Sequence, residues 1–338
     1  MTAASDKLAA VLRQALAPRF GGDIEIADLR KLSGGASRET WAFDAVTANG
    51  RRRPLILKRD PVGAHVDARA GVDAELGVDR PTEGRLFAAA NMAGVPAPEV
   101  RALLPADAKT SAGFVMDRID GLVLGRHVLR DPALAGARPR LARQCGEILA
   151  RLHAMPADTL PPLKTLDPAD LLRVYRDLLD RVGHPYPGFE YGLCWLDERR
   201  EFWSGRRAPV HGDFRIGNLV VGPDGVRGVL DWELAHIGDP LFDLGWLCIP
   251  AWRYGQIDKP VGGVGDRADL LAGYAAAGGG DVGLEALRYW EAFGCLRWGM
   301  LCLIMGFAHL DGRRRSIEYA AIGRRTAETE HDLLTLID

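Results

Sequence analysis

The chain has 338 residues, of which 47% are hydrophobic, and this composition excludes a protein that is disordered throughout. Its 43 Lys and Arg residues against 45 Asp and Glu residues leave a formal net charge of −2, which argues against nucleic acid or an anionic membrane as partner. The length favours two lobes or domains, and five cysteines without a Cys-x-x-Cys pair predict reduced thiols rather than disulfides or structural zinc.

Two segments bear on the compartment of the protein. Residues 1–20 have the pattern of an amphipathic helix and lack the uninterrupted apolar core of a signal peptide. Residues 298–310 are strongly apolar but only thirteen long, so they predict a buried helix rather than a membrane span. We therefore expect a cytoplasmic protein that binds no membrane. The sequence carries no signal for the oligomeric state.

A β-rich segment follows the first helix. Three strands are predicted there, over residues 24–32, 38–46 and 54–58. The connection between the first two strands is Ser-Gly-Gly-Ala-Ser, which is either a hairpin turn or a phosphate-binding loop. In the second case, the backbone N–H groups of Gly34 and Gly35 and the hydroxyl of Ser37 would contact phosphate oxygens.

Lys58 ends the third strand and is conspicuous, because only six of the 43 basic residues are lysines. Its ammonium group either reaches water at the strand end or has a function. A helix over about 81–93 comes next, opened by Pro81 and closed by Gly94. Glu83 lies in its first turn, where it either meets the preference of helix starts for acidic residues or pairs with Lys58.

The rest of the chain divides into one more strand, a hairpin and a series of helices. The strand covers residues 113–119, which turn polar and meet Asp120-Gly121. Helices are predicted over about residues 132–154, 167–181, 188–204, 240–249, 266–276, 284–310 and 314–337. The sequence thus predicts an α+β protein with a β-rich amino-terminal lobe, about 1–118, and a mainly helical carboxy-terminal lobe, about 119–338.

The hairpin carries two polar clusters. Residues 219–221 and 226–230 read as short buried strands joined by a Gly-Pro-Asp-Gly turn. His211-Gly212-Asp213 precedes the hairpin, Asn218 opens it and Asp231 follows it. Because a hairpin returns the chain to its starting end, we expect Asp213, Asn218 and Asp231 to converge.

This set of side chains suits phosphoryl transfer. One carboxylate accepts or orients the proton of the attacking hydroxyl, while a carboxamide and a second carboxylate are hard oxygen ligands for Mg²⁺. The alternative is that these are ordinary turn residues, since turns favour Asp, Asn and Gly. The joint pattern favours the functional interpretation. His211 is interpreted as ordering the loop through hydrogen bonds rather than as the base.

The order and spacing of the motifs resemble the aminoglycoside phosphotransferase and choline kinase-like family, which has the protein-kinase-like two-lobe fold. The resemblance rests on HGDFRIGN at 211–218, DWE at 231–233 and GDPLFDL at 238–244. The HGDxRxGN form is most similar to the kinase-like domain associated with acyl-CoA dehydrogenases. Only seven residues, 232–238, separate Asp231 from Asp239, and no Ala-Pro-Glu follows. The absence of an activation segment favours a small-molecule acceptor.

The resemblance implies roles for specific residues. Asp213 would be the catalytic base and Arg215 a contact of the γ-phosphate, while Asn218 and Asp231 would bind Mg²⁺. The donor would be ATP or GTP. Its site would comprise Gly34, Gly35, Ser37, Lys58 and Glu83 around the phosphates, and Met116, Asp117 and Ile119 at the hinge beside the base. Asp243 would support the catalytic loop.

The acceptor is an alcohol or an amine presented to Asp213. Residues 252–338 contain ten basic against twelve acidic residues, a balance too even to predict a polycationic acceptor. The resemblance favours a hydroxyacyl compound, with an aminoglycoside antibiotic as the alternative. A nucleotide-binding sensor without turnover and a metal-dependent hydrolase also remain open. The hydrolase leaves the glycine segment and Lys58 unexplained.

Overall fold

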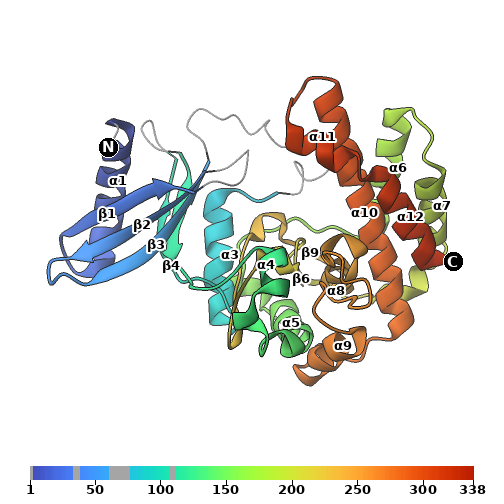
Figure 1. The fold of residues 1–338 in the computed structure, drawn as a ribbon, viewed down its shortest axis with the longest axis horizontal. Coiled ribbons are helices and arrows are strands. Elements are labelled where there is room, and N and C mark those ends of the chain that lie inside the picture. The colour runs from blue at the N-terminus through green and yellow to red at the C-terminus, as the bar shows by residue number, and fades with distance from the viewer. Residues whose placement is uncertain (1–2, 33–38, 61–76, 107–110) are drawn as a thin grey trace.

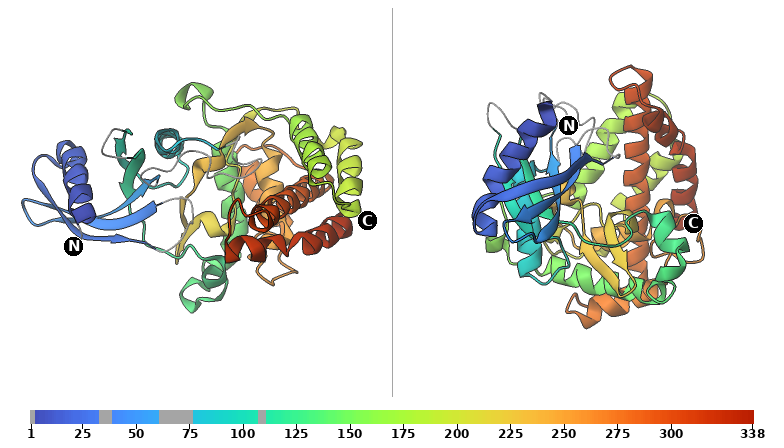
Figure 2. Two further views of the ribbon diagram at one scale, coloured as in Figure 1. Left: turned by 90° about the horizontal axis from the view of Figure 1, so that it is seen from above. Right: turned by 60° about the vertical axis from the view of Figure 1, so that its left-hand side comes forward.

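The computed structural model describes residues 3–32, 39–60, 77–106 and 111–338. The predicted loop residues Gly34, Gly35 and Ser37 lie outside these ranges. A β-sheet with the amino-terminal helix stands at one end of the molecule, and a larger group of helices stands at the other (Figures 1 and 2). This is the α+β, protein-kinase-like, two-lobe architecture that the sequence predicts. A boundary near residue 118 stays a prediction.

The sheet has five antiparallel strands in the order β1-β2-β3-β5-β4. The strands are β1 Ile24–Lys31, β2 Glu39–Thr47, β3 Arg52–Arg59, β4 Val100–Leu104 and β5 Gly113–Asp117. β3 lies at the centre, because it pairs with both β2 and β5. In this register Ile56 lies between Ala42 and Met116, and Lys58 lies between Thr40 and Phe114.

The two faces of the sheet enter different cores. Helix α1, Ala3–Phe20, packs Leu8, Leu12 and Leu16 on one face, against side chains that include Leu55 and Leu57. Because side chains alternate along a strand, Ile56 and Lys58 point to the opposite face. That face joins the main core of the molecule, in which Met116 and Phe114 are buried together with residues of the helical lobe.

Helix α3, Arg80–Met92, follows the sequence prediction of 81–93 within one residue. The side chain of Asp79 caps it by accepting a hydrogen bond from the backbone N–H of Thr82 at 2.8 Å. Its apolar side chains Leu86 and Phe87 are buried in the main core. The helix therefore packs into the helical lobe as well as against β4 and β5.

The helical lobe is built around one long helix. Its helices are α4 Gly125–Arg130, α5 Arg138–His153, α6 Pro168–Val182, α7 Pro187–Asp197, α8 Leu241–Cys248, α9 Arg267–Ala276, α10 Leu284–Leu310, α11 Ile317–Gly323 and α12 Thr326–Ile337. Helix α10 packs against α7, α8, α11 and α12. Its bounds are those predicted from the sequence.

Helix α10 is, among the described residues, the one helix long and apolar enough to cross a membrane by length and composition. Its most apolar window of 18 residues has a mean hydropathy of 1.4, but 67% of that window is buried inside the protein. Its 27 residues exceed the thirteen-residue apolar stretch on which the sequence argument relied. Burial against neighbouring helices accounts for its apolar composition.

Three predicted helices differ from the structure. The helix predicted over 132–154 begins as a 3₁₀ turn at Pro132–Leu134, and the α-helix starts only at Arg138. The helix predicted over 188–204 ends at Asp197, and a separate 3₁₀ turn covers Arg200–Phe202. The helix predicted over 314–337 is two helices, because the chain breaks where Gly323 packs directly against Gly306 of α10.

Two small sheets hold the polar clusters. The predicted hairpin is formed by β7 Leu219–Gly222 and β8 Gly225–Val229. The second sheet was not predicted: it pairs β6 Ala208–Val210 with β9 His236–Gly238, three residues each. A further bridge joins Leu122 to Val221, which ties the chain leaving the β-lobe to the hairpin.

Candidate active site

The loop that carries Asp213 begins where β6 ends. Gly212 has φ +79°, in the left-handed region that favours glycine. A Cβ atom on this residue would collide with the carbonyl oxygen of Leu234. The sharp turn at Gly212 therefore requires glycine both for its conformation and for its close approach to the segment after Asp231.

Asp243 of α8 holds this turn through hydrogen bonds to its backbone. Its carboxylate is fully buried and accepts hydrogen bonds from the backbone N–H groups of His211 at 2.7 Å and Gly212 at 3.0 Å. The Nε2 atom of His153 lies 3.3 Å from the same carboxylate. Burial alone would raise the pKa of Asp243, but the hydrogen bond and charge of His153 and the contacts from His211 hold it below its ordinary value. The supporting role implied for Asp243 has this geometric basis.

His211 links the loop to the strand that leads to Asp231. It is fully buried, with Nε2 2.9 Å from the carbonyl oxygen of Leu230 and Nδ1 accepting from the backbone N–H of Asp213 at 3.2 Å. Burial lowers the pKa of His211, so the neutral ring fits both contacts. The ring orders the loop, as the sequence interpretation has it.

The carboxylate of Asp213 is surrounded by hydrogen-bond donors. Asn218 Nδ2 donates to Oδ2 at 2.6 Å, and Arg215 Nε lies 3.1 Å from Oδ1 and 3.2 Å from Oδ2. The indole Nε1 of Trp246, in α8, donates to Oδ1 at 2.9 Å. Sequence reasoning named the first two residues and missed Trp246, which reads as an ordinary apolar residue of a buried helix.

Lys58 joins the two lobes. Its ammonium group contacts the carboxylate of Asp231 and lies 3.3 Å from Oε1 of the buried Glu83. Burial alone would lower the pKa of Lys58, but these two carboxylates outweigh burial and hold it above its ordinary value. The residue that the sequence placed at the end of a strand is thus paired with Glu83, and the same ammonium group reaches the segment after the hairpin.

Arg80 is a buried cation in the same place that the sequence did not single out. Its guanidinium contacts Glu83, lies 3.1 Å from Asp60 and 3.8 Å from Glu233, and its side chain is 1% exposed. The carbonyl oxygen of Glu233 also accepts from the backbone N–H of Val78 at 2.9 Å. Arg80 therefore helps to neutralise the negative charge of Glu83 beside Lys58. It also lies near Glu233, which contacts the chain at the start of α3.

Asn218 and Asp231 meet the requirements of an Mg²⁺ site in chemistry. The backbone N–H of Leu230 donates to the carbonyl oxygen of Asn218 at 2.8 Å, which brings Asp231 beside Asn218. Since the amide nitrogen of Asn218 binds Asp213, its amide oxygen is left to face other groups. One carboxylate and one amide oxygen are hard ligands of the kind Mg²⁺ takes together with water and phosphate oxygens. No group of three or more His, Cys, Asp and Glu suited to a metal occurs within the described ranges.

The predicted hinge residues lie at the end of β5. Met116 is buried on the sheet face that carries Lys58, whereas the carboxylate of Asp117 binds Arg53 at 3.1 Å and Arg101 at 2.6 Å. The backbone N–H of Asp117 donates to the carbonyl oxygen of Glu99 at 2.9 Å. Asp117 therefore has only its carbonyl group to offer to a ligand.

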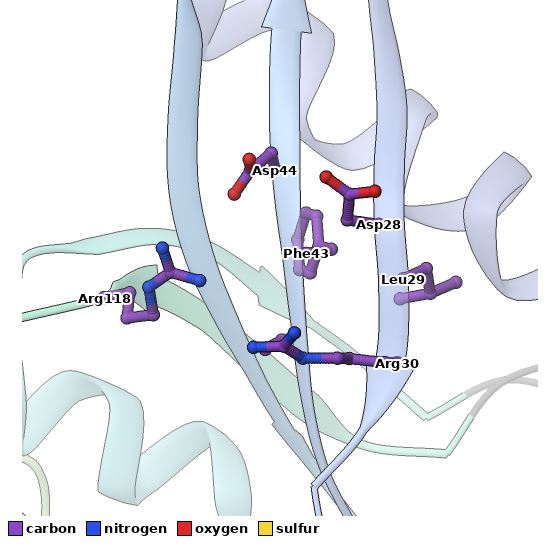
Figure 3. Close-up of a pocket in the computed structure, with 7 residues that line it drawn as sticks. Asp28, Leu29, Arg30, Phe43, Asp44 and Arg118 are labelled. Atoms are coloured by element: carbon purple, nitrogen blue, oxygen red, sulfur yellow. The ribbon is translucent and has the colours of Figure 1, made fainter.

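A hollow of about 490 Å³ opens on the face of the sheet away from α1 (Figure 3). It is lined by Asp28, Leu29, Arg30, Ala42, Phe43, Asp44 and Arg118. Ala42 pairs with Ile56, which in turn pairs with Met116 on the next strand. Arg118 directly follows the predicted hinge residue Asp117. The hollow thus lies at the hinge end of the face on which Lys58 stands.

Aromatic rings stand beside Arg215. The guanidinium of Arg215 lies 4.8 Å from the ring centroid of Trp252, which lies 4.9 Å from that of Trp298. The guanidinium of Arg325 lies 5.8 Å from the ring centroid of Trp298. The indole nitrogens of Trp252 and Trp298 are buried and have no hydrogen-bond partner among the residues that the structure describes. The surroundings of Arg215 are therefore rich in hydrogen-bond donors.

Comparison with known proteins identifies the family to which the chain belongs. Residues 28–290 match the model of the phosphotransferase enzyme family. The mouse protein acyl-CoA dehydrogenase family member 10 is 26% identical over 209 residues, which cover 58% of this chain but 18% of that protein. The chain thus spans less than a fifth of this relative.

Two solved structures share the fold. A candidate aminoglycoside phosphotransferase of Ralstonia eutropha has a TM-score of 0.74 at 19% identity, covering 98% of both chains. A thermostable mutant of aminoglycoside phosphotransferase APH(4)-Ia, in a ternary complex with ADP and hygromycin B, has a TM-score of 0.60 at 15% identity, again covering 98% of both chains.

Proposed function

Because the chain belongs to the phosphotransferase enzyme family, we propose that it transfers the γ-phosphoryl group of ATP, or of GTP, to a hydroxyl group of a small molecule. One observation carries this proposal: a single hydrogen-bonded series links the implied base to the implied phosphate site. Asp213 binds Asn218, the carbonyl oxygen of Asn218 accepts from Leu230, and the next residue, Asp231, holds Lys58.

The reaction assigns a task to each group. The acceptor oxygen attacks the γ-phosphorus, and the bond to the oxygen that bridges the β- and γ-phosphates breaks. Asp213 orients the acceptor hydroxyl and takes up its proton. Mg²⁺, held by Asn218 and Asp231, would neutralise charge on the β- and γ-phosphate oxygens. The guanidinium of Arg215, held by Nε against Asp213, would present its terminal nitrogens to the γ-phosphate.

The nucleotide would lie along the sheet face that carries Lys58. Lys58, released from Asp231, would bind the α- and β-phosphates while Glu83 keeps it in place. The base would lie under Ile56 and Met116 and meet the carbonyl group of Asp117 and the backbone of Ile119. The hollow beside Arg118 would then adjoin the base. Gly34, Gly35 and Ser37 would cover the phosphates.

A hydroxyacyl compound fits the surroundings of Arg215 better than a polycation does. The guanidinium of Arg215 is a donor there, and it lies beside the rings of Trp252 and Trp298. Such donors attract carbonyl or anionic oxygens, and the rings suit an apolar segment, whereas an aminoglycoside needs carboxylates. The similarity to acyl-CoA dehydrogenase family proteins points to the same class of compound.

Transfer of phosphate from [γ-³²P]ATP to a panel of acceptors tests the proposal. The panel contains hydroxyacids and their thioesters, and aminoglycosides such as hygromycin B, each assayed with and without Mg²⁺. Asp213→Asn should lower kcat by about 10²- to 10⁴-fold, the range of general-base catalysis, while the nucleotide still binds. Asp224→Asn, in the exposed hairpin turn, is the matched control and should keep full activity.

The outcomes separate the alternatives. Labelled product from hydroxyacyl compounds that requires Asp213 supports the proposal, and product from aminoglycosides alone would reassign the acceptor. Nucleotide binding without transfer to any compound would favour a sensor. Cleavage of a compound without ATP would favour the hydrolase.

A further inference from the structure

The catalytic loop is held by a pair of residues from the two core helices α8 and α10. Trp246 of α8 donates its indole N–H to Asp213 Oδ1 at 2.9 Å. Arg297 of α10 donates from Nη1 to the carbonyl oxygen of Gly212 at 2.6 Å. The guanidinium of Arg297 also lies 4.4 Å from the ring centroid of Trp246. One unit thus fixes the side chain of Asp213 and the main chain just before it.

The three donors to Asp213 differ in how firmly they are held. Arg215 is 27% exposed, and its terminal nitrogens would turn to the γ-phosphate in the proposed reaction. Asn218 shares its amide group with the proposed metal. Trp246 is 2% exposed and lies between Arg297 and the ring of Trp252, whose centroid is 5.3 Å away. Of these three donors, the N–H group of Trp246 is the one whose position would not change when the nucleotide or the acceptor binds.

The position of the cation strengthens this donor. A guanidinium over the face of an indole is attracted to the ring electrons and draws them away from the N–H group. A hydrogen bond to an ionised carboxylate is stronger than one between neutral groups. It holds the carboxylate in one orientation, which sets the direction that its oxygens offer to the acceptor hydroxyl.

We propose that Trp246 is a positioning residue for the phosphoryl-transfer reaction, whose indole N–H, backed by Arg297, aims the Asp213 carboxylate at the acceptor hydroxyl. The inference rests on the proposed function, because it takes Asp213 as the base. It adds a residue to which the resemblance assigns no role. It assigns a role in the reaction to a side chain that would otherwise count as core packing.

Trp246→Phe tests the role of the N–H group, because phenylalanine keeps an aromatic ring and removes the donor. Trp290→Phe is the matched control: Trp290 is as deeply buried, and its N–H donates at 3.2 Å to the backbone carbonyl of Phe202. We expect Trp246→Phe to lower kcat about tenfold, the loss of one hydrogen bond to a charged group, with KM for ATP changed less than about twofold. Trp290→Phe should leave both kcat and KM for ATP unchanged.

A second measurement does not need turnover. In a ¹H–¹⁵N spectrum of the indole groups of the eight tryptophans, the Trp246 signal is assigned by its loss in Trp246→Phe. Asp213→Asn should shift this signal and speed its hydrogen exchange, while the Trp290 signal stays in place. If Trp246→Phe does not fold, the Trp246 signal is assigned instead by sequential resonance assignment of the wild-type protein.

The results distinguish the inference from the proposed function. If no acceptor is phosphorylated but the Trp246 signal responds to Asp213→Asn, the contact stands and the reaction is wrong. If Asp213→Asn abolishes transfer while Trp246→Phe has the same kcat as Trp290→Phe, the reaction stands and Trp246 only contributes to core packing. An indole signal that is indifferent to Asp213→Asn would also overturn the inference.

Discussion

The ammonium group of Lys58 contacts the carboxylate of Asp231, although the two residues are 173 positions apart in the chain. The contact joins the central strand of the sheet to the end of the hairpin that carries Asn218. It places a cation where the phosphates of a nucleotide would lie, with Glu83 behind it at 3.3 Å. In the proposed function, a nucleotide with its metal would compete with Lys58 for Asp231, so we expect the donor to bind at this ion pair.

Replacing Lys58 by methionine should weaken nucleotide binding without unfolding the protein. Glu83 remains paired with Arg80, so no buried carboxylate loses its last cation. Loss of a charge-assisted contact to phosphate predicts an increase in KM for ATP of about 10- to 100-fold. Calorimetric titration with ATP and Mg²⁺ measures the loss of affinity directly.

Lys31→Met is the control for this variant. Lys31 also ends a strand of the sheet and pairs with Glu39 at 2.7 Å, but its side chain is 53% exposed. We expect no change in its ATP affinity. Equal affinities for the Lys58 and Lys31 variants would remove Lys58 from the nucleotide site.

Asp243→Asn should destabilise the fold. In the variant an amide group replaces one of two oxygens that accept from His211 and Gly212, so an N–H group of the loop loses its buried acceptor. The expected cost in unfolding free energy is about 2–4 kcal/mol. Urea unfolding followed by tryptophan fluorescence measures it. Asp224→Asn, on an exposed turn, should change stability by less than about 0.5 kcal/mol. A stable Asp243 variant would mean that the loop keeps its shape without this carboxylate.

His236 should make stability depend on pH between about 4 and 6.5. Burial lowers the pKa of His236 from 6.5 to about 4, so in this range the unfolded chain binds a proton that the folded protein excludes. Stability is therefore full above pH 6.5 and falls as the pH drops toward 4, by at most about 3 kcal/mol from this residue.

Unfolding free energies of the wild type and His236→Asn at several pH values isolate this contribution. The asparagine amide can still donate to the carbonyl oxygen of Leu234, which lies 2.9 Å from Nδ1. The variant should lose stability less steeply between pH 6.5 and 4. His331→Asn, at an exposed position of α12, should keep the slope of the wild type. Parallel curves for wild type and His236→Asn would contradict the prediction.

Gly212→Ala should lower the free energy of unfolding by more than the penalty for its backbone conformation alone. The φ of +79° carries a penalty of about 1 kcal/mol for alanine, and the added Cβ also meets the Leu234 carbonyl. Gly50→Ala isolates the first effect, since Gly50 has φ +77° and no atom within 4 Å of the added Cβ. Thermal unfolding should show a larger loss for Gly212→Ala, accompanied by loss of activity. Equal losses would show that the loop moves aside at no cost.

Local sequence patterns predicted the elements that carry the site. The turn residues predicted the hairpin. Because a hairpin returns the chain to its starting end, it also predicted that Asp213, Asn218 and Asp231 lie close together. Lys58 stood out because the chain has only six lysines and this one ends an apolar strand, and Glu83 is the carboxylate in the first turn of the helix that follows. Their contact at 3.3 Å agrees with that expectation. The roles of the site residues in catalysis stay predictions.

The features that the sequence did not reveal depend on packing between distant segments. Sheet β6–β9 has three residues in each strand, too few for any alternation to show. Trp246 and Arg297 follow the helical spacing of core residues, and only the fold places one at Asp213 and the other at Gly212. Arg80 reads as a surface residue before a proline, yet it is 1% exposed.

Helix α3 is fastened at both ends to the opposite lobe. Val78, just before it, donates to the carbonyl oxygen of Glu233 at 2.9 Å, and the carbonyl oxygen of Pro96, just after it, accepts from Val229 at 2.8 Å. Leu86 and Phe87 anchor it in the main core between these points. Moving this helix outward would break both backbone hydrogen bonds and expose Leu86 and Phe87. The position of Glu83 beside Lys58 is therefore set by the packing of the two lobes against each other.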